Sequence, residues 1–262
     1  MTPVRPKKAL GQHFLTDMNV ARRIASTIDD CPELPVVEVG PGTGVLTQFL
    51  LEAGRDLTVV ELDSESVEYL RAGNLPALRP ERIVEGDFLR LDLPALTGGR
   101  KMCLIGNYPY NISSQIFFKV LDCRDVVEEC TGMLQREVAE RICAREGSKT
   151  RGILSVLLQV WYDCEYLFTV SEGVFNPPPK VKSGVIRLRR NAVTDPGCDF
   201  ALMRLVVKTT FGQRRKTIRN SARGLLRPGA VFPADCELGA LRPEQLTVAQ
   251  FIELTNIIAG LR

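Results

Sequence analysis

The sequence predicts an α/β protein with a mostly parallel sheet of about seven strands, followed by a small all-α domain. Two observations support this prediction. Short apolar runs of β type alternate with amphipathic segments through roughly the first 190 residues, which is typical of βαβ units. From Asp195 onward the strand signals stop, and the remaining segments show helical periodicity.

Seven apolar runs are the strand candidates: 36–40, 57–63, 82–87, 102–107, 130–134, 164–170 and 183–190. Segments with helical periodicity lie around 199–226, 234–241 and 247–260. Turn-forming residues cluster at 191–197. We therefore predict a first domain over residues 1–192 and a second, helical domain over residues 193–262.

The composition indicates an ordinary globular protein, with 45% hydrophobic and 25% charged residues in 262. No apolar run approaches the roughly 18 residues that a membrane span needs. The N-terminal residues lack the apolar core of a signal peptide. We expect a cytoplasmic monomer without a membrane partner.

The cysteine pattern argues against metal and redox chemistry. The eight cysteines are scattered without a Cys-x-x-Cys pair, and His13 is the only histidine. Spacing of this kind does not match a zinc site. We expect reduced core cysteines and no metal.

Basic residues gather in one stretch of the predicted helical domain. Net charge is only +3, but Arg204 to Arg227 contain eight Lys or Arg and no Asp or Glu. A charge run is often only a solvated face, yet one without compensating acids repels itself. We predict polyanion binding there, centred on Arg214, Arg215, Lys216 and Arg219.

A glycine-rich loop follows the first strand. Gly40, Gly42 and Gly44 end that strand and open the first helix, where glycines let a ligand approach the backbone. A dinucleotide fingerprint requires a third glycine where Val45 stands, which disfavours NAD. By itself the loop fits any tight strand-to-helix turn.

Acidic residues end the next two strands. The Glu61 carboxylate can accept both ribose hydroxyls of an adenosine-containing cofactor, and Asp87 can accept from an adenine amine with Phe88 packed on the ring. Carboxylates at successive strand ends facing one crevice favour a cofactor site.

The fourth strand runs into Asn107, Tyr108, Pro109 and Tyr110. Asn107 can accept a hydrogen bond from an amine, the Tyr108 or Pro109 carbonyl can supply a second acceptor, and Tyr110 can stack on a base. No residue of the segment is a strong general base. The set therefore fits methyl transfer from a sulfonium to an aromatic amine, which depends on positioning.

At these motifs the sequence resembles the ribosomal RNA adenine N6,N6-dimethyltransferase family, and most of all its bacterial small-subunit (16S) branch. The resemblance covers nearly the whole chain. It is carried by KKALGQHFL (7–15), EVGPGTG, VVELD, EGDF, GNYPYNIS, FNPPPKVKSGVIRL (175–188) and FGQRRKTIRNS (211–221). The sequence departs from the family at Tyr108, commonly Leu, and at His13, often Asn.

The resemblance implies a Rossmann-like class I methyltransferase domain that uses S-adenosyl-L-methionine. The expected cofactor-binding residues are His13, Leu15, Gly40, Gly42, Glu61, Asp87, Phe88 and Asn107, and the expected catalytic and target-base residues are Asn107, Tyr110 and Phe175. The 211–221 segment resembles the family's RNA-binding signature.

The activity implied is dimethylation of two adjacent adenines in a hairpin loop near the 3′ end of small-subunit rRNA. Expected partners are that RNA and pre-30S particles, with a role in ribosome biogenesis. Three alternatives remain open: a large-subunit rRNA adenine methyltransferase of the antibiotic-resistance type, a non-catalytic assembly factor, and a DNA adenine methyltransferase, which would have to flip a base out of a duplex.

Overall fold

The structure is a computed structural model that describes residues 4, 6–7, 10–28 and 31–262. The chain divides into two compact units. The first contains the residues up to Ala139 together with Asp163–Arg190, and the second contains Glu140–Tyr162 and Asn191–Arg262. The predicted domain boundary at residue 192 stays a prediction. Residues 140–162 group with the C-terminal segment, which the sequence did not predict.

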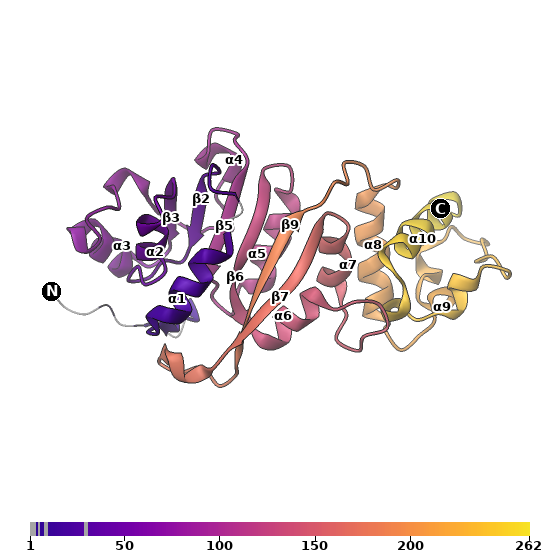
Figure 1. Ribbon diagram of the computed structural model, residues 1–262. Coiled ribbons are helices and arrows are strands. Elements are labelled where there is room, and N and C mark those ends of the chain that lie inside the picture. The colour runs from indigo at the N-terminus through magenta and orange to yellow at the C-terminus, as the bar shows by residue number, and fades with distance from the viewer. Residues whose placement is uncertain (1–3, 5, 8–9, 29–30) are drawn as a thin grey trace. The chain divides into compact units, whose positions relative to one another are not determined.

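A seven-stranded sheet forms the centre of the first unit (Figure 1). Its strands are β2 (Val36–Val39), β3 (Leu57–Glu61), β4 (Ile83–Glu85), β5 (Met102–Asn107), β6 (Val127–Gln135), β7 (Tyr162–Val170) and β9 (Ser183–Arg190). Their order across the sheet is β4-β3-β2-β5-β6-β9-β7. The pairs from β4 to β6 are parallel, and β9 is antiparallel to β6. The predicted fold class is therefore confirmed.

The central strands are apolar because both of their faces are covered. β2 and β3 are buried along their whole length, as is β5 up to its last residue. Strands that are buried on both faces have continuous apolar sequences, which explains why these strands could be predicted from the sequence. A second, two-stranded sheet pairs β1 (Phe14–Leu15) with β8 (Phe175–Asn176). Strands of two residues give no detectable periodicity, and this pair was not predicted.

Helices surround the sheet of the first unit. They are α1 (Met18–Ala25), η2 (Ser26–Ile28), α2 (Thr47–Glu52), α3 (Ser64–Tyr69), η3 (Leu70–Asn74), η4 (Pro80–Arg82), α4 (Leu93–Leu96), α5 (Ser113–Asp122), η5 (Glu172–Val174) and the start of α6 (Arg136–Cys143). The α1 helix begins where the Asp17 carboxylate accepts from the backbone N–H groups of Asn19 and Val20. Its buried face packs into one apolar core with residues of β2, β3 and β5.

The second unit is all helical in its described secondary structure. It contains α7 (Ile153–Gln159), α8 (Phe200–Gly212), α9 (Ile218–Ser221), η6 (Arg223–Leu225), η7 (Glu237–Ala240), η8 (Pro243–Gln245) and α10 (Val248–Gly260). α8 packs against both α7 and α10. Stacked rings of Phe211 and Phe251, 6.0 Å apart, fix the second contact. The predicted 234–241 helix is only a 3₁₀ turn. No helix in the described ranges is long and apolar enough to cross a membrane.

A buried acid lies in β2, two residues before the glycine loop. Glu38 is completely buried and accepts a hydrogen bond from Thr47 Oγ1 at 2.7 Å. Burial, helped by the charge of Glu61 and opposed by the Thr47 hydrogen bond, raises the pKa of Glu38 from 4.5 to about 8. Glu38 is therefore neutral at pH 7, as its apolar surroundings require.

Glu38→Gln is expected to flatten the pH dependence of stability. Between pH 4.5 and about 8 the folded protein holds a proton that the unfolded chain has lost. The stabilisation is complete below 4.5 and is lost as the pH rises to about 8. The slope from this group is at most about 1.4 kcal/mol per pH unit. Urea unfolding at several pH values checks this, and parallel curves for wild type and variant would contradict it.

Candidate functional site

The sheet order creates a crevice at one place. The chain runs outward from β2 to β3 and β4, then crosses back to β5 on the other side of β2. Neighbouring connections therefore leave in opposite directions between β2 and β5. Ligands of open α/β sheets bind at the carboxyl ends of the strands at such a switch point.

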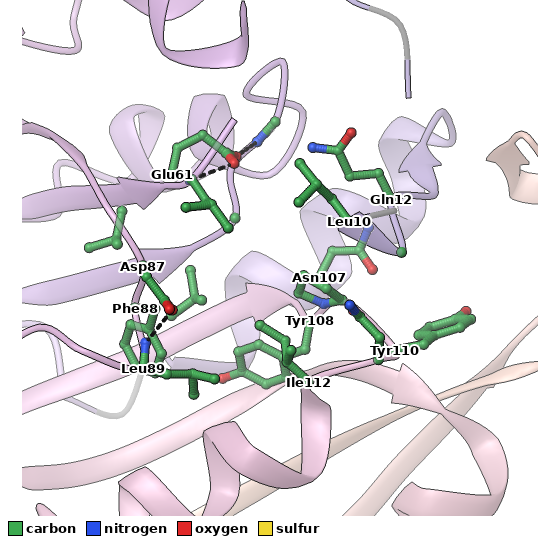
Figure 2. Close-up of a pocket in the computed structure, with 18 of the residues that line it drawn as sticks. Leu10, Gln12, Glu61, Asp87, Phe88, Leu89, Asn107, Tyr108, Tyr110 and Ile112 are labelled. Carbon is green, nitrogen blue, oxygen red and sulfur yellow. Dashed lines mark hydrogen bonds between the residues drawn. The ribbon is translucent and has the colours of Figure 1, made fainter. Parts of the chain in front are cut away.

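A cavity of about 320 Å³ lies at this point. Its described lining comes from the carboxyl ends of β2 to β5 and from two loops: Leu10, Gly11, Gln12, His13, Phe14, Val39, Gly40, Gly42, Val60, Glu61, Leu62, Gly86, Asp87, Phe88, Leu89, Asn107, Tyr108, Pro109, Tyr110, Asn111, Ile112 and Gln115. Glu61, Asp87 and Phe88 lie on one side, and Asn107 and Tyr110 on the other (Figure 2). The volume suits a drug-sized ligand.

Two glycines present their backbone to this cavity. Gly40 and Gly42 have φ values of +69° and +56°, a region that side chains disfavour. A Cβ at Gly42 would also lie 2.9 Å from the Phe14 ring. The loop therefore depends on glycine for both its conformation and its close packing, and a nucleoside-sized ligand can lie directly against it.

The Glu61 carboxylate is held rigidly at the end of β3. Oε2 accepts from the Gly42 N–H at 3.0 Å, and Oε1 accepts from the N–H groups of Leu62 and Asp63, each at 2.9 Å. A carboxylate has about four acceptor positions, so roughly one remains for a ligand. Burial raises the pKa of Glu61, although these three backbone bonds oppose the shift. A ligand hydroxyl would thus find a preoriented acceptor.

Asp87 and Phe88 follow β4 on the same side of the cavity. Asp87 Oδ1 accepts from the Leu89 N–H at 2.9 Å, and the Phe88 ring is almost fully buried. Lys119 fixes the loop by donating to the carbonyls of Leu89 and Leu91 at 3.1 and 2.6 Å. The arrangement offers an apolar surface beside a carboxylate, which fits an adenine ring and its amine.

The Asn107 amide has a defined orientation at the end of β5. Nδ2 donates to the His13 carbonyl at 2.9 Å. Because a carbonyl can only accept, this contact identifies the nitrogen and leaves Oδ1 as an acceptor for the cavity. Asn107 thus presents a neutral acceptor and also ties the N-terminal segment to the sheet.

Tyr110 lies beside His13, with ring centroids 5.3 Å apart. Its hydroxyl shares a 2.6 Å hydrogen bond with Ser183 Oγ, and burial raises its pKa. His13 Nδ1 donates to the Pro177 carbonyl at 2.8 Å, which fixes the ring. The tyrosine hydroxyl is therefore neutral and hydrogen-bonded, and Tyr110 is among the residues that line the cavity.

Tyr108, one of the two departures from the pattern of the family that the sequence resembles, is a packing residue. Its hydroxyl donates to the Thr131 carbonyl at 2.8 Å, and its ring packs edge-on against Phe117. Gly106 and Gly132 leave space for the ring, since a Cβ at these positions would lie 2.9 and 2.6 Å from it. The larger side chain is thus accommodated beneath the site.

Two predicted site residues lie outside the cavity lining. Leu15 and Phe175 are partners in the β1–β8 pair, and both are buried in the apolar core. Only 4% of Phe175 is exposed. The structure therefore gives them a part in holding the N-terminal segment in place, and direct contact with a ligand stays a prediction for both.

Several lining residues were not singled out from sequence. Leu10 and Gln12 come from the N-terminal motif, and Leu62, about half exposed, follows Glu61 directly. Gly11 has φ +64°, and a Cβ there would lie 2.6 Å from Asn111 Oδ1. The sequence did contain a signal for Leu62: a large apolar residue that directly follows the acidic residue at the end of a strand could have been predicted to line the cavity.

The basic cluster lies in the second unit, in and after the turn between α8 and α9. Arg215 and Lys216 are exposed. Arg214 is half-buried and donates to the Lys149 carbonyl at 2.5 Å, and Arg219 donates to the Ala234 carbonyl at 2.9 Å. Arg214 and Arg219 therefore also have structural roles, which sequence alone did not reveal.

Comparison with known proteins identifies the family. Residues 4–259 match the family described as ribosomal RNA adenine dimethylase. Ribosomal RNA small subunit methyltransferase A of Parabacteroides distasonis is 62% identical over 262 residues, covering 98% of this chain and 95% of its own. The protein of that name from Phocaeicola vulgatus is 60% identical over 253 residues, covering 97% and 89%.

Solved structures agree with this result. A dimethyladenosine transferase from Plasmodium falciparum shares the fold, with a TM-score of 0.77 at 22% identity over 92% of this chain and 96% of its own. The structure of the 23S rRNA methyltransferase ErmE matches with a TM-score of 0.68 and 28% sequence identity, covering 92% of this chain and 99% of its own. The chain belongs to the ribosomal RNA adenine dimethylase family.

Proposed function

We propose that this chain transfers methyl groups from S-adenosyl-L-methionine to N6 of two adjacent adenosines in a hairpin loop near the 3′ end of small-subunit (16S) rRNA. The observation that carries the proposal is the orientation of Asn107. Its Nδ2 is held by the His13 carbonyl, so Oδ1 is available to an amine in the cavity. Family membership and the names of the curated relatives support the RNA substrate.

The cavity fits the cofactor. We assign the ribose to Glu61, the adenine to Asp87 and Phe88, and the close backbone approach to Gly40 and Gly42. When bound, S-adenosyl-L-methionine supplies a methyl group activated by a sulfonium. We further assign His13, which also lines the cavity, to the cofactor.

Asn107 Oδ1 would accept one N–H of the adenine amine, and the Pro109 carbonyl would accept the other. Two acceptors fix the direction of the nitrogen lone pair, which is the main requirement for in-line transfer. Tyr110 would stack on the base. The lining carboxylates of Glu61 and Asp87 already accept backbone hydrogen bonds on the far side of the cavity. The methylated amine, a strong acid, would lose its proton to water.

Glu61→Ala is expected to weaken cofactor binding and leave RNA affinity nearly unchanged. A hydrogen bond to a charged acceptor contributes roughly 1.5 to 3 kcal/mol, or about ten- to hundredfold in Kd. The variant also leaves the Gly42, Leu62 and Asp63 amides without their acceptor. Calorimetry with S-adenosyl-L-methionine measures the effect, and an unchanged Kd would remove Glu61 from the site.

Replacing both Arg215 and Lys216 by Ala is expected to weaken RNA binding without changing stability, because both side chains are exposed. The slope of log K against log salt should fall by about 0.7 to 0.9 for each lost phosphate contact. Cofactor binding should be intact. Fluorescence titrations at several salt concentrations measure the slope.

Arg214→Ala is the matched control, because its guanidinium holds the Lys149 carbonyl. It should lower the unfolding temperature as well as RNA affinity. If the slope of log K against log salt is unchanged in the Arg215 and Lys216 double variant, these two side chains do not contact RNA phosphates and are only solvated.

The proposed substrate is tested by methyl incorporation into 30S-type particles, naked small-subunit rRNA, large-subunit rRNA and duplex DNA. We expect transfer to adenines of the small-subunit substrates only. Transfer to large-subunit rRNA or to duplex DNA would favour one of the other enzymes, and no transfer to any substrate would favour a binding factor. We propose pre-30S particles as the partner, with the chain acting as a monomer in the cytoplasm.

A further inference from the structure

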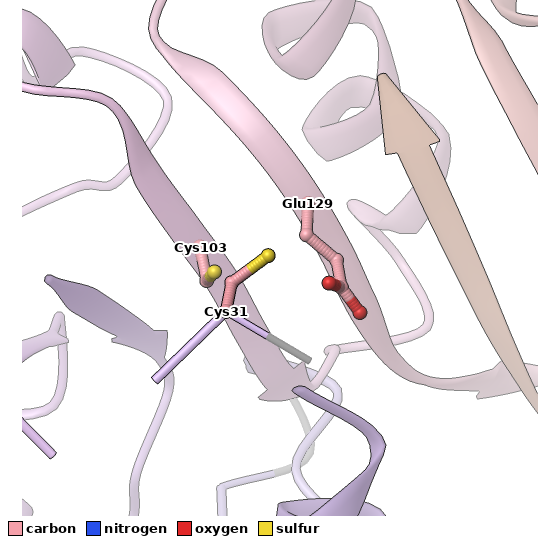
Figure 3. A group of neighbouring side chains, drawn as sticks. All are labelled: Cys31, Cys103 and Glu129. Carbon is pink, nitrogen blue, oxygen red and sulfur yellow. The ribbon is translucent and has the colours of Figure 1, made fainter. Parts of the chain in front are cut away.

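Two cysteines and one glutamate converge at the end of the sheet opposite the cavity. Cys103 in β5 and Glu129 in β6 are register partners, and Cys31 lies in the loop before β2. The two Sγ atoms and a carboxylate oxygen all lie within 4.8 Å of one another. In the view of Figure 3 the Cys31 side chain lies between the other two. The described residues contain no other group of three potential metal ligands this close.

Glu129 has a buried carboxyl group whose two oxygens lack hydrogen-bond partners among the described residues. Only 1% of the residue is exposed. Burial raises the pKa of Glu129, and the positive charges of Arg187 and Arg55 offset this only in part. Buried carboxylates are ordinarily paired or bound to a metal. A metal ion bound between Glu129 and the two thiols would supply the partner that its carboxylate oxygens lack.

The ligand types select the metal. Thiolates bind soft and borderline ions, and two sulfurs with one carboxylate oxygen match Zn²⁺ rather than Mg²⁺ or Ca²⁺. In a tetrahedral site with Zn–S bonds of about 2.3 Å, ligand atoms lie about 3.8 Å apart. The three atoms here need to approach by at most about 1 Å to reach that spacing. Cys31, in a loop and half-buried, can make this adjustment and admit a water as the fourth ligand.

The charges nearly balance around such an ion. Two thiolates and a carboxylate carry three negative charges. Zn²⁺ neutralises two of them, so one negative charge remains. The Arg55 guanidinium compensates this remaining charge: its Nη2 donates to the Cys31 carbonyl at 2.6 Å, and its Nε is buried without a partner among the described groups. Arg187, the other guanidinium that acts on Glu129, is paired with Glu165 at 2.8 Å. Thiols are ordinarily protonated at neutral pH when no metal is bound. Binding then forms two Zn–S bonds and releases two protons to solvent.

We propose that Cys31, Cys103 and Glu129 form a zinc site that ties the loop before β2 to strands β5 and β6. Cys103 precedes Asn107 by four residues in β5, which places the ion about 13 Å along the strand from the cavity end. The metal would therefore stabilise the fold without taking part in methyl transfer. Sequence spacing predicted no metal because the three residues are far apart in the chain.

Titration of the purified, chelator-treated protein with Co²⁺ tests the site directly. We expect thiolate-to-cobalt absorption that saturates at one ion per chain and disappears when Zn²⁺ is added. Cys31→Ser and Glu129→Gln should each lower the affinity at least about tenfold. Cys123→Ser, at a half-buried thiol outside the cluster, is the matched control and should behave as wild type. No thiolate absorption, or equal titrations in Cys31→Ser and wild type, would overturn the proposal.

A second test needs no variant. Alkylation of Cys31 in the native protein is followed by mass spectrometry with and without Zn²⁺. At a zinc concentration tenfold above Kd about one chain in eleven is metal-free, so the Cys31 rate should fall about tenfold. Cys123 should react at its original rate, and a chelator should restore Cys31. A Cys31 rate that zinc does not change would overturn the proposal even if the variants fail to fold.

Discussion

Asn107→Ala is expected to abolish methyl transfer while cofactor binding becomes weaker but remains measurable. The variant removes Oδ1, one of two proposed acceptors for the adenine amine, and loss of one preorganised group at a reaction centre typically costs about 10²- to 10³-fold. It also removes the Nδ2 bond to the His13 carbonyl, which loosens a segment that lines the cavity. Single-turnover rates and calorimetry separate the two effects.

Asn107→Asp distinguishes a neutral acceptor from a general base. If the site needed a base, Asp would preserve or raise the rate. In our account Asp gains little, because it cannot donate to the His13 carbonyl and adds an anion beside a cationic cofactor. Asn74→Ala, an exposed amide outside the cavity, is the matched control. An active Asn107→Asp, with a rate that rises steeply with pH, would require us to withdraw the assignment.

Tyr110→Ala is expected to lower methylation about 5- to 150-fold and to leave RNA affinity nearly unchanged. A base stacked on an aromatic ring gains about 1 to 3 kcal/mol, whereas phosphate contacts supply most of the binding. Tyr110→Phe should keep most of the activity, because the ring that stacks on the base is retained. The lost hydroxyl is neutral and bonds only to Ser183 among the described residues, so it has no part in the proposed transfer. If Tyr110→Phe is inactive, the hydroxyl takes part in the reaction and stacking alone does not explain the role of Tyr110.

Phe175→Ala provides the contrast for Tyr110. The Phe175 ring is buried in the core, so its removal should lower stability by about 3 to 5 kcal/mol. Methylation would then fall together with the fraction of folded protein. A large loss of activity at unchanged stability would instead support the predicted stacking of Phe175 on the target base. Unfolding curves measured beside the activity assay decide between these results.

The sheet could be predicted from sequence because its strands are buried on both faces. The run at 102–107 is apolar until the chain reaches the cavity at Asn107, so one segment indicated both a strand and a residue that lines the cavity. Glu61 and Asp87 were found in the same way, as polar residues at the ends of apolar runs. In each case the polar residue and the apolar run before it are neighbours in the chain, so the sequence alone contains the pattern.

Contacts between distant segments could not be predicted. The hydrogen bond from Asn107 to the His13 carbonyl joins residues 94 positions apart. Phe175 was predicted as a site aromatic, and its pairing with Leu15 in the β1–β8 sheet, which buries it, could not be read from the sequence. In the sequence Arg214 cannot be distinguished from its neighbour Arg215. In the structure only Arg214 is seen to donate a hydrogen bond to the Lys149 carbonyl. Each of these roles depends on a partner that no spacing rule identifies.

Mass spectrometry of adenines in ribosomal RNA from cells with and without this gene tests the proposed dimethylation. We predict that two adjacent N6,N6-dimethyladenosines near the 3′ end of small-subunit rRNA disappear when the gene is deleted. Wild-type protein should restore them, and Asn107→Ala should not. Dimethylated adenines that persist without the gene, or a lost mark that maps to large-subunit rRNA, would contradict the account.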